Sequence, residues 1–165
     1  MRCFGVATFL VLAASGCVSR EYSPGPGPRR VLAGEPGGPF APVAARLHPL
    51  TRFEADPVGG AIELIAHVEL RDRWGDSVKG AGVARFVLWE SVGAEDGSTL
   101  RWEVDLTDLA LNAAHYDPST RTYRFELKGV GAWATSGGVT LSVAYDVVGG
   151  NGSIETLRDR AVVGG

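Results

Sequence analysis

Histidines and carboxylates are the residues of this 165-residue chain whose types fit metal or acid–base chemistry. His48, His67 and His115 lie far apart and have neither the i, i+4 spacing nor the cysteine partners of metal sites. A single histidine on a solvated strand is ordinary polar surface. A hydrolase would need His67 or His115 to meet carboxylates in one pocket. The spacing therefore predicts no metal site and no catalytic residue.

A second set of acidic residues is a candidate for calcium binding. Asp72 and Asp76, with Asp105 or Asp108, are placed to gather oxygen ligands at one end of a domain. They lack the dense D-x-D-x-D spacing of a calcium loop, so turn formation is the favoured interpretation. The chain also lacks a Gly-x-Ser-x-Gly motif, a Walker loop and a dinucleotide fingerprint. We predict a non-enzymatic protein without a cofactor.

Two tryptophans are the candidate ligand-binding residues. Trp74 falls in a predicted turn and Trp133 in the glycine-rich stretch 129–138. An exposed ring there would stack on a sugar or insert into a partner, because interfaces favour tryptophan. The alternative is that one or both rings fold back and cover an open end of the domain.

The amino-terminal segment has the layout of an export signal. Arg2 precedes an apolar stretch of eleven residues, 4–14, and small residues follow directly before Cys17. A helix of that length rises about 16 Å, short of the roughly 20 residues that span a bilayer. Residues 1–16 are therefore predicted to be a signal peptide.

The small residues followed by Cys17 resemble the lipobox of bacterial lipoproteins, although Ala14 stands where that pattern more often has leucine. The resemblance implies that the Cys17 thiol receives a diacylglycerol and becomes the first mature residue. Two or more acyl chains anchor a protein stably to a membrane. The resemblance also implies sorting to the outer membrane, because Val18 and not aspartate follows the cysteine. Ordinary secretion with cleavage nearby is the alternative.

Residues 17–45 form a predicted disordered linker. The stretch 18–45 holds six prolines and five glycines without a sustained period, a composition that cannot fold alone. A flexible tether of this length averages about 30 Å end to end. Loss of Arg2 with the signal lowers the basic count from 16 to 15 against 19 acidic residues, a formal charge of −4. No basic stripe is present, so nucleic acid is not a predicted partner.

Residues 46–165 are predicted to be one β-domain, because apolar and polar residues alternate along most of them. Stretch 61–72 predicts a strand whose wet side carries Glu63, His67, Glu69 and Arg71. Stretch 83–90 is apolar on both faces and predicts a central strand. Further strands are predicted near 50–54 and at 101–106, 122–128, 139–147 and 154–162. Asn151-Gly152 predicts a type I′ hairpin turn.

One short helix is predicted within 105–116, capped by Thr107 or Asp108 and crossing between sheets. About seven short strands with turns every 10 to 15 residues or so favour an all-β, two-sheet sandwich. The run Asp72, Gly75–Val78, Gly80 and a strand through Phe86 resembles the repeated domains of bacterial immunoglobulin-like surface proteins. There an Asp-x-x-Gly-Asn-Pro-Val turn joins two strands; here Asp76 and Ser77 replace Asn and Pro.

These features predict an envelope lipoprotein with a non-catalytic, immunoglobulin-like sandwich. The fold alone does not fix its molecular function, since such sandwiches have many roles. Its expected partners are the membrane, through the lipid anchor, and another envelope protein or glycan. Its expected location is the outer membrane, facing the periplasm or the cell surface. A carbohydrate- or peptide-binding module that uses Trp74 and Trp133 is the alternative function.

Overall fold

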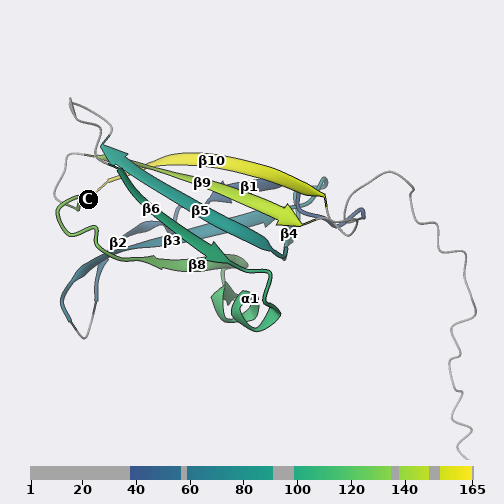
Figure 1. Ribbon diagram of the computed structural model, residues 1–165, viewed down its shortest axis with the longest axis horizontal. Helices are drawn as coiled ribbons and strands as arrows, with labels where there is room; N and C mark the ends of the chain where they lie inside the picture. Colours follow the sequence, from purple (N-terminus) through teal and green to yellow (C-terminus); the bar gives the residue numbers. More distant parts are fainter. Residues whose placement is uncertain (1–37, 57–58, 91–98, 135–137, 149–152, 165) are drawn as a thin grey trace, which may run out of the picture. The chain divides into compact units, whose positions relative to one another are not determined.

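The computed structural model describes residues 38–56, 59–90, 99–134, 138–148 and 153–164, which form an all-β domain of two antiparallel sheets (Figure 1). In chain order, the elements are β1 (Ala44–Leu47), β2 (Arg52–Ala55), β3 (Ile62–Arg71), β4 (Ser77–Val78), β5 (Gly82–Glu90), β6 (Thr99–Asp105), α1 (Leu109–His115), β7 (Tyr116–Asp117), β8 (Thr122–Leu127), β9 (Val139–Val148) and β10 (Ile154–Val163).

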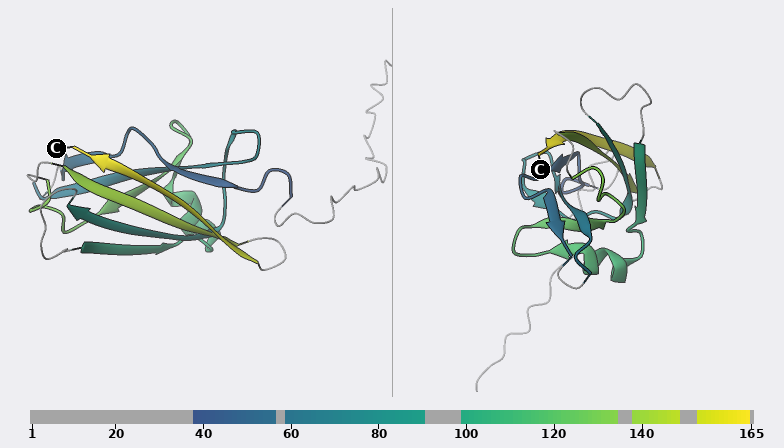
Figure 2. Two further views of the ribbon diagram at one scale, coloured as in Figure 1. Left: turned by 90° about the horizontal axis from the view of Figure 1, so that it is seen from above. Right: turned by 90° about the vertical axis from the view of Figure 1, so that its left-hand side faces the viewer.

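The two sheets have different strand orders. The first sheet runs β1-β3-β8-β7, with β2 and β4 also paired to β3, and the second runs β10-β9-β5-β6. Figure 2 shows the two layers facing each other. The chain crosses between them three times, from β4 to β5, from β6 through α1 to β7, and from β8 to β9.

The core fills the space between the sheets, as the alternation predicts. Phe86 of β5 meets Phe125 of β8 with ring centroids 4.8 Å apart. Every second residue of β9 is buried, from Val139 to Val147, and β8 buries Tyr123, Phe125 and Leu127. The predicted central strand at 83–90 is confirmed, because β5 pairs with β6 on one side and β9 on the other.

The predicted wet side of β3 is wrong. His67 and Glu69 are both buried, together with all the residues between Leu64 and Leu70. β3 is the most heavily paired strand, because β1 and β2 pair along one edge of it and β4 and β8 along the other, so its side chains lie among those of neighbouring strands. Glu69 keeps its charge in this position through hydrogen bonds from Arg71 Nε, at 2.8 Å, and Ser77 Oγ, at 2.5 Å.

The predicted helix is confirmed, and so is its cap. The Asp108 carboxylate accepts hydrogen bonds from the main-chain N–H groups of Ala110 and Leu111 at 2.7 and 3.0 Å, as an N-cap does. The structure adds β1, β4 and β7 to the predicted strands. Each is too short for alternation to show, and β1 begins inside the range assigned to the linker. Asn151-Gly152 lies outside the described residues.

Candidate functional site

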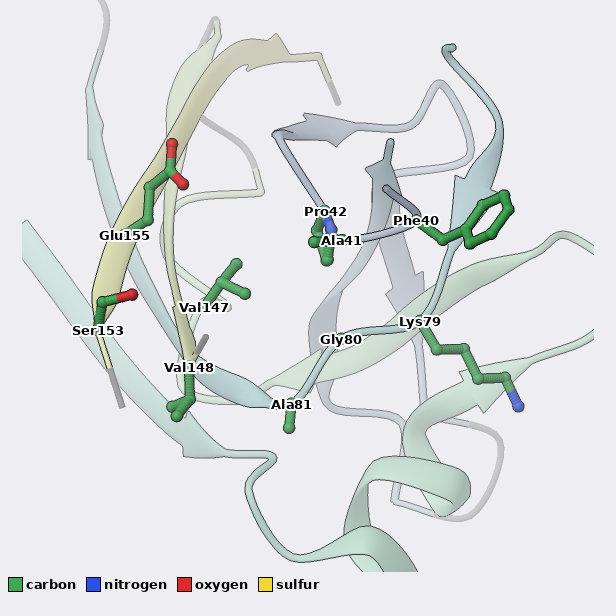
Figure 3. A pocket seen from close by; sticks show the side chains of 10 residues that line it. All are labelled: Phe40, Ala41, Pro42, Lys79, Gly80, Ala81, Val147, Val148, Ser153 and Glu155. Atoms are coloured by element: carbon green, nitrogen blue, oxygen red, sulfur yellow. The ribbon is translucent and has the colours of Figure 1, made fainter. Parts of the chain in front are cut away.

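A groove of about 210 Å³ opens at one end of the sandwich (Figure 3). We call this the linker end, because residues 38–43 lead there into β1. The groove lies between that segment, the β4–β5 connection and the facing ends of β9 and β10. It is lined by Phe40, Ala41, Pro42, Lys79, Gly80, Ala81, Val147, Val148, Ser153 and Glu155. Figure 3 shows the side chains of Phe40 and Lys79 extending from its rim, away from Val147.

The groove exists because several strands begin or end here. β3 ends at Arg71, β5 begins at Gly82 and β9 ends at Val148, whose N–H donates to the carbonyl oxygen of Ala81 at 3.2 Å. Gly82 must be glycine for this crossing. A Cβ on it would clash with the carbonyl oxygen of Asp146 and would lie 2.7 Å from Tyr145 Cε1.

The turn beside the groove is built by the Asp72 carboxylate. Its Oδ1 accepts hydrogen bonds from the N–H groups of Trp74, at 2.9 Å, and Asp76, at 3.0 Å. The Asp72 N–H donates to the Asp76 carbonyl at 3.0 Å, and Gly75 takes the left-handed conformation with φ 86°. The contacts of the Asp72 carboxylate are thus those of a turn-forming residue, the interpretation that the sequence favours.

This turn holds the Trp74 ring against the Phe40 ring, with centroids 5.5 Å apart. The Arg73 guanidinium lies 5.5 Å from the centroid of the Trp74 ring. Both rings are open to solvent, since Phe40 is 70% and Trp74 59% exposed. An exposed aromatic pair therefore stands next to the groove, and Trp74 does not fold back as a cover.

A hydrogen-bonded cluster of Tyr123, Tyr145, Asn112 and Gly80 fixes Gly80, which lines the groove. The Gly80 carbonyl accepts from Tyr145 Oη at 2.8 Å and from Asn112 Nδ2 at 2.9 Å. The Gly80 N–H donates to Tyr123 Oη at 3.1 Å, and Tyr123 Oη lies 3.0 Å from Asn112 Oδ1, to which it can donate. Asn112 Nδ2 also donates to the carbonyl of Leu106 at 3.0 Å. One amide side chain thus joins α1 to the β4–β5 crossing, at Gly80, and to the β6–β7 crossing, at Leu106.

The cluster stays neutral. Burial raises the pKa of the Tyr145 hydroxyl far above its ordinary value, and the nearby Tyr123 adds to that rise. Burial also raises the pKa of Tyr123, against the lowering effect of its hydrogen bonds to Gly80 and Asn112. Both hydroxyls therefore act as hydrogen-bonding groups, not as bases.

Charged groups flank the groove. Lys79 Nζ lies 4.0 Å from the centroid of the Tyr116 ring, a cation–π distance. Glu155 lies across the groove on β10 (Figure 3). The linker end thus carries charges of both signs around an apolar centre.

Trp133, the other predicted ligand-binding residue, lies at the opposite end of the domain. Its loop follows β8, which pairs Leu127 with Leu64, whereas Trp74 follows the other end of β3, where Leu70 pairs with Val78. Trp133 is partly buried and packs against the core. The structure does not bring the two tryptophans into one site.

The histidines occupy three separate environments. His67 is buried, and its Nδ1 lies 2.8 Å from Thr122 Oγ1. Burial, and after it the positive charge of Arg124, lowers the pKa of His67. His115 Nδ1 bonds the Arg124 carbonyl at 2.8 Å, and His48 Nδ1 accepts from the Leu50 N–H at 3.3 Å. Within the described ranges, no three His, Cys, Asp or Glu residues are grouped to hold a metal ion.

Cys17, the predicted lipidation site, lies outside the described residues, as does the predicted signal peptide. Among the helices of the described part of the chain, none has the length and apolar character that a bilayer crossing requires.

In comparisons with known proteins, no family model, no curated protein and no solved structure matches this chain. The groove was missed by sequence reasoning because Phe40–Pro42 falls in the Pro/Gly-rich stretch assigned to the linker. The remaining lining residues are small or belong to strand ends that the alternation does not place together. The available signal was a large aromatic residue, Phe40, within a few residues of the first strand.

Proposed function

We propose that this protein is an envelope lipoprotein, anchored to the outer membrane through Cys17, whose sandwich domain binds another envelope component. The observation that carries the proposal is the placement of the apolar groove and the exposed Phe40–Trp74 pair. Both lie at the end of the domain that is joined through residues 18–37 to Cys17. Singly exposed apolar residues are ordinary, but grouped ones mark interaction sites.

The proposed domain type is an immunoglobulin-like sandwich. In that fold, strands A, B and E share one sheet and strands C, F and G the other. The order β1-β3-β8 matches A-B-E, and β10-β9-β5 matches G-F-C, with β6 in the place of strand C′. This order supports the resemblance carried by Asp72, Gly75–Val78 and Gly80.

Binding is proposed in preference to catalysis because the buried polar side chains beside the groove, Tyr123, Tyr145 and Asn112, are hydrogen-bonded to one another and to Gly80. Tyr123, Tyr145, Asn112 and the Gly80 backbone form a closed cluster that ties two crossings together. A polar group whose hydrogen bonds are all made within the protein holds the backbone in place and needs no substrate as a partner.

Metabolic labelling tests the anchor. Radiolabelled palmitate should enter the wild-type chain and the Cys3→Ser variant, because Cys3 is discarded with the signal. The Cys17→Ser variant should remain unlabelled, and membrane fractionation should place the labelled protein in the outer membrane. A wild-type chain that stays unlabelled refutes the anchor.

A second candidate function is carbohydrate or peptide recognition through Trp74, which its exposed ring favours. An aromatic face of this kind can stack on a sugar ring or on an apolar side chain. Binding on a glycan or peptide array should be lost in Trp74→Ala and kept in Trp133→Ala, since Trp133 lies at the other end. Binding that survives in Trp74→Ala removes this mechanism.

A further inference from the structure

The linker end carries more exposed apolar side chains than two rings. Five of the ten exposed large apolar residues in the described part of the chain lie around this end: Phe40, Trp74, Leu109, Val148 and Ile154. Val43 and Leu111 are exposed farther along the same segments, and the other three, Leu50, Ile62 and Val162, lie elsewhere. Leu109 borders Lys79–Ala81 from the start of α1, and Ile154 pairs with Val148 at the start of β10.

We propose that this apolar end, defined by Phe40, Trp74, Leu109, Val148 and Ile154, rests on the surface of the bilayer in which the protein is anchored. The inference deepens the proposed function, on which it rests, by naming the lipid headgroup region as the component bound at this site. Tryptophan and other amphipathic rings are favoured in that region, where one side of the ring is apolar and the other wet.

The covalent path favours this end over the other. From Cys17 to Gly38 the chain has 21 peptide links, which reach at most about 75 Å when fully extended. The opposite end of the sandwich is farther by the length of β3, whose ten residues span about 33 Å. The end with the apolar residues is therefore the end that the tether brings to the bilayer with the least extension.

Because the domain is tethered, even a weak affinity of the apolar end for lipid is enough to keep it at the bilayer. Linking two modules by a short flexible segment gives an effective concentration on the order of millimolar. If the untethered domain bound lipid with a millimolar dissociation constant, the apolar end of the tethered domain would thus contact the bilayer for a large part of the time. Two exposed rings with three aliphatic neighbours fit a contact of this strength.

The charges around this end indicate which lipids are needed. Arg73 and Lys79 face solvent together with Asp76 and Glu155, so cations and carboxylates alternate. Anionic lipids attract clusters of four or more basic residues, and the described residues of this end hold no such cluster. The contact therefore depends on the rings, and we expect it on neutral and anionic membranes alike.

Fluorescence quenching by lipids tests the contact on the full mature, lipidated chain. The protein is reconstituted into phosphatidylethanolamine–phosphatidylglycerol vesicles that carry bromine on their acyl chains, which quenches only nearby tryptophans. Wild-type emission should be quenched, most of that quenching should disappear in Trp74→Phe, and Trp133→Phe should keep it. A Phe40→Ala variant should reduce the quenching while leaving the circular dichroism spectrum unchanged.

The outcomes separate the two proposals. A mature chain whose mass lacks the diacylglycerol refutes the anchor, and the docking inference with it. A lipidated chain that floats with vesicles but shows no quenching, or equal quenching in Trp74→Phe, refutes the docking alone. Trp74-dependent binding of a glycan or peptide by such an unquenched chain would assign the apolar end to that ligand.

Discussion

The hydroxyl of Tyr145 in β9 donates a 2.8 Å hydrogen bond to the main-chain carbonyl of Gly80, in the segment that crosses from one sheet to the other. Asn112 of α1 donates to the same carbonyl at 2.9 Å. A strand, a helix and a crossing are thereby fixed at one oxygen atom. The position of Gly80, which lines the groove, depends on these two donors.

Replacement of Tyr145 by phenylalanine should lower the free energy of unfolding by about 1 kcal/mol, because one buried hydrogen bond is lost while the ring remains. Urea denaturation followed by tryptophan fluorescence measures the change. Tyr116→Phe is the matched control, since the structure engages Tyr116 through its ring, against Tyr123 and Lys79. Equal midpoints for Tyr145→Phe and the wild type would contradict the role of this hydroxyl.

The Gly82→Ala substitution should destabilise the domain by roughly 1–3 kcal/mol, the usual cost of overpacking a core position. Its new methyl would meet the Asp146 carbonyl and Tyr145 Cε1, and the main-chain oxygen cannot move without breaking the β5–β9 pairing. Gly131→Ala is the control, because a Cβ there meets nothing within 4 Å. Thermal or urea unfolding of both variants tests this prediction. A Gly82→Ala protein as stable as Gly131→Ala would show that the backbone at the crossing shifts to accommodate the methyl group at little cost.

Asp72 should be required for the turn that presents Trp74. Alanine at this position leaves the N–H groups of Trp74 and Asp76 without their shared acceptor, which costs about 0.5–1.5 kcal/mol for each hydrogen bond lost. An asparagine side chain would keep an oxygen at that place, so Asp72→Asn should retain most of the stability that Asp72→Ala loses. Denaturation midpoints and the exchange rates of these two amide protons provide the test; similar exchange in both variants would mean that the carboxylate does not hold the turn.

Much of this architecture follows from alternation in the sequence. Seven strands, the helix and its Asp108 cap are all predicted, because half-buried strands and caps are local patterns. The burial of His67 and Glu69 is not fully local, since it depends on side chains of neighbouring strands, such as Thr122 of β8 beside His67 and Ser77 of β4 beside Glu69. A polar residue on an alternating strand predicts a solvated face only when the neighbouring strands do not surround it with their own side chains.

The candidate site shows the same limit. Trp74 is a recognisable candidate because a large ring in a turn is unusual, and the structure leaves it exposed. Its neighbour Phe40 comes from a segment more than thirty residues earlier, and no local pattern reports that contact. Trp74 and Trp133 are both predicted ligand-binding residues, and only the register of β3 with β4 and β8 shows that they lie at opposite ends of the domain.

The buried His67 should make the protein less stable in mild acid. Burial, and then Arg124, lowers its pKa in the folded chain, whereas the unfolded chain takes up its proton near pH ~6.5. The unfolded state then binds more protons, so the stability present above that pH is lost as the pH falls below it. The His67→Gln variant retains a polar side chain opposite Thr122 but has no ionisation. Its free energy of unfolding, measured in urea from pH 7.5 to 5.5, should decline less steeply than that of the wild type, and parallel curves for the two proteins would show that His67 does not supply this dependence.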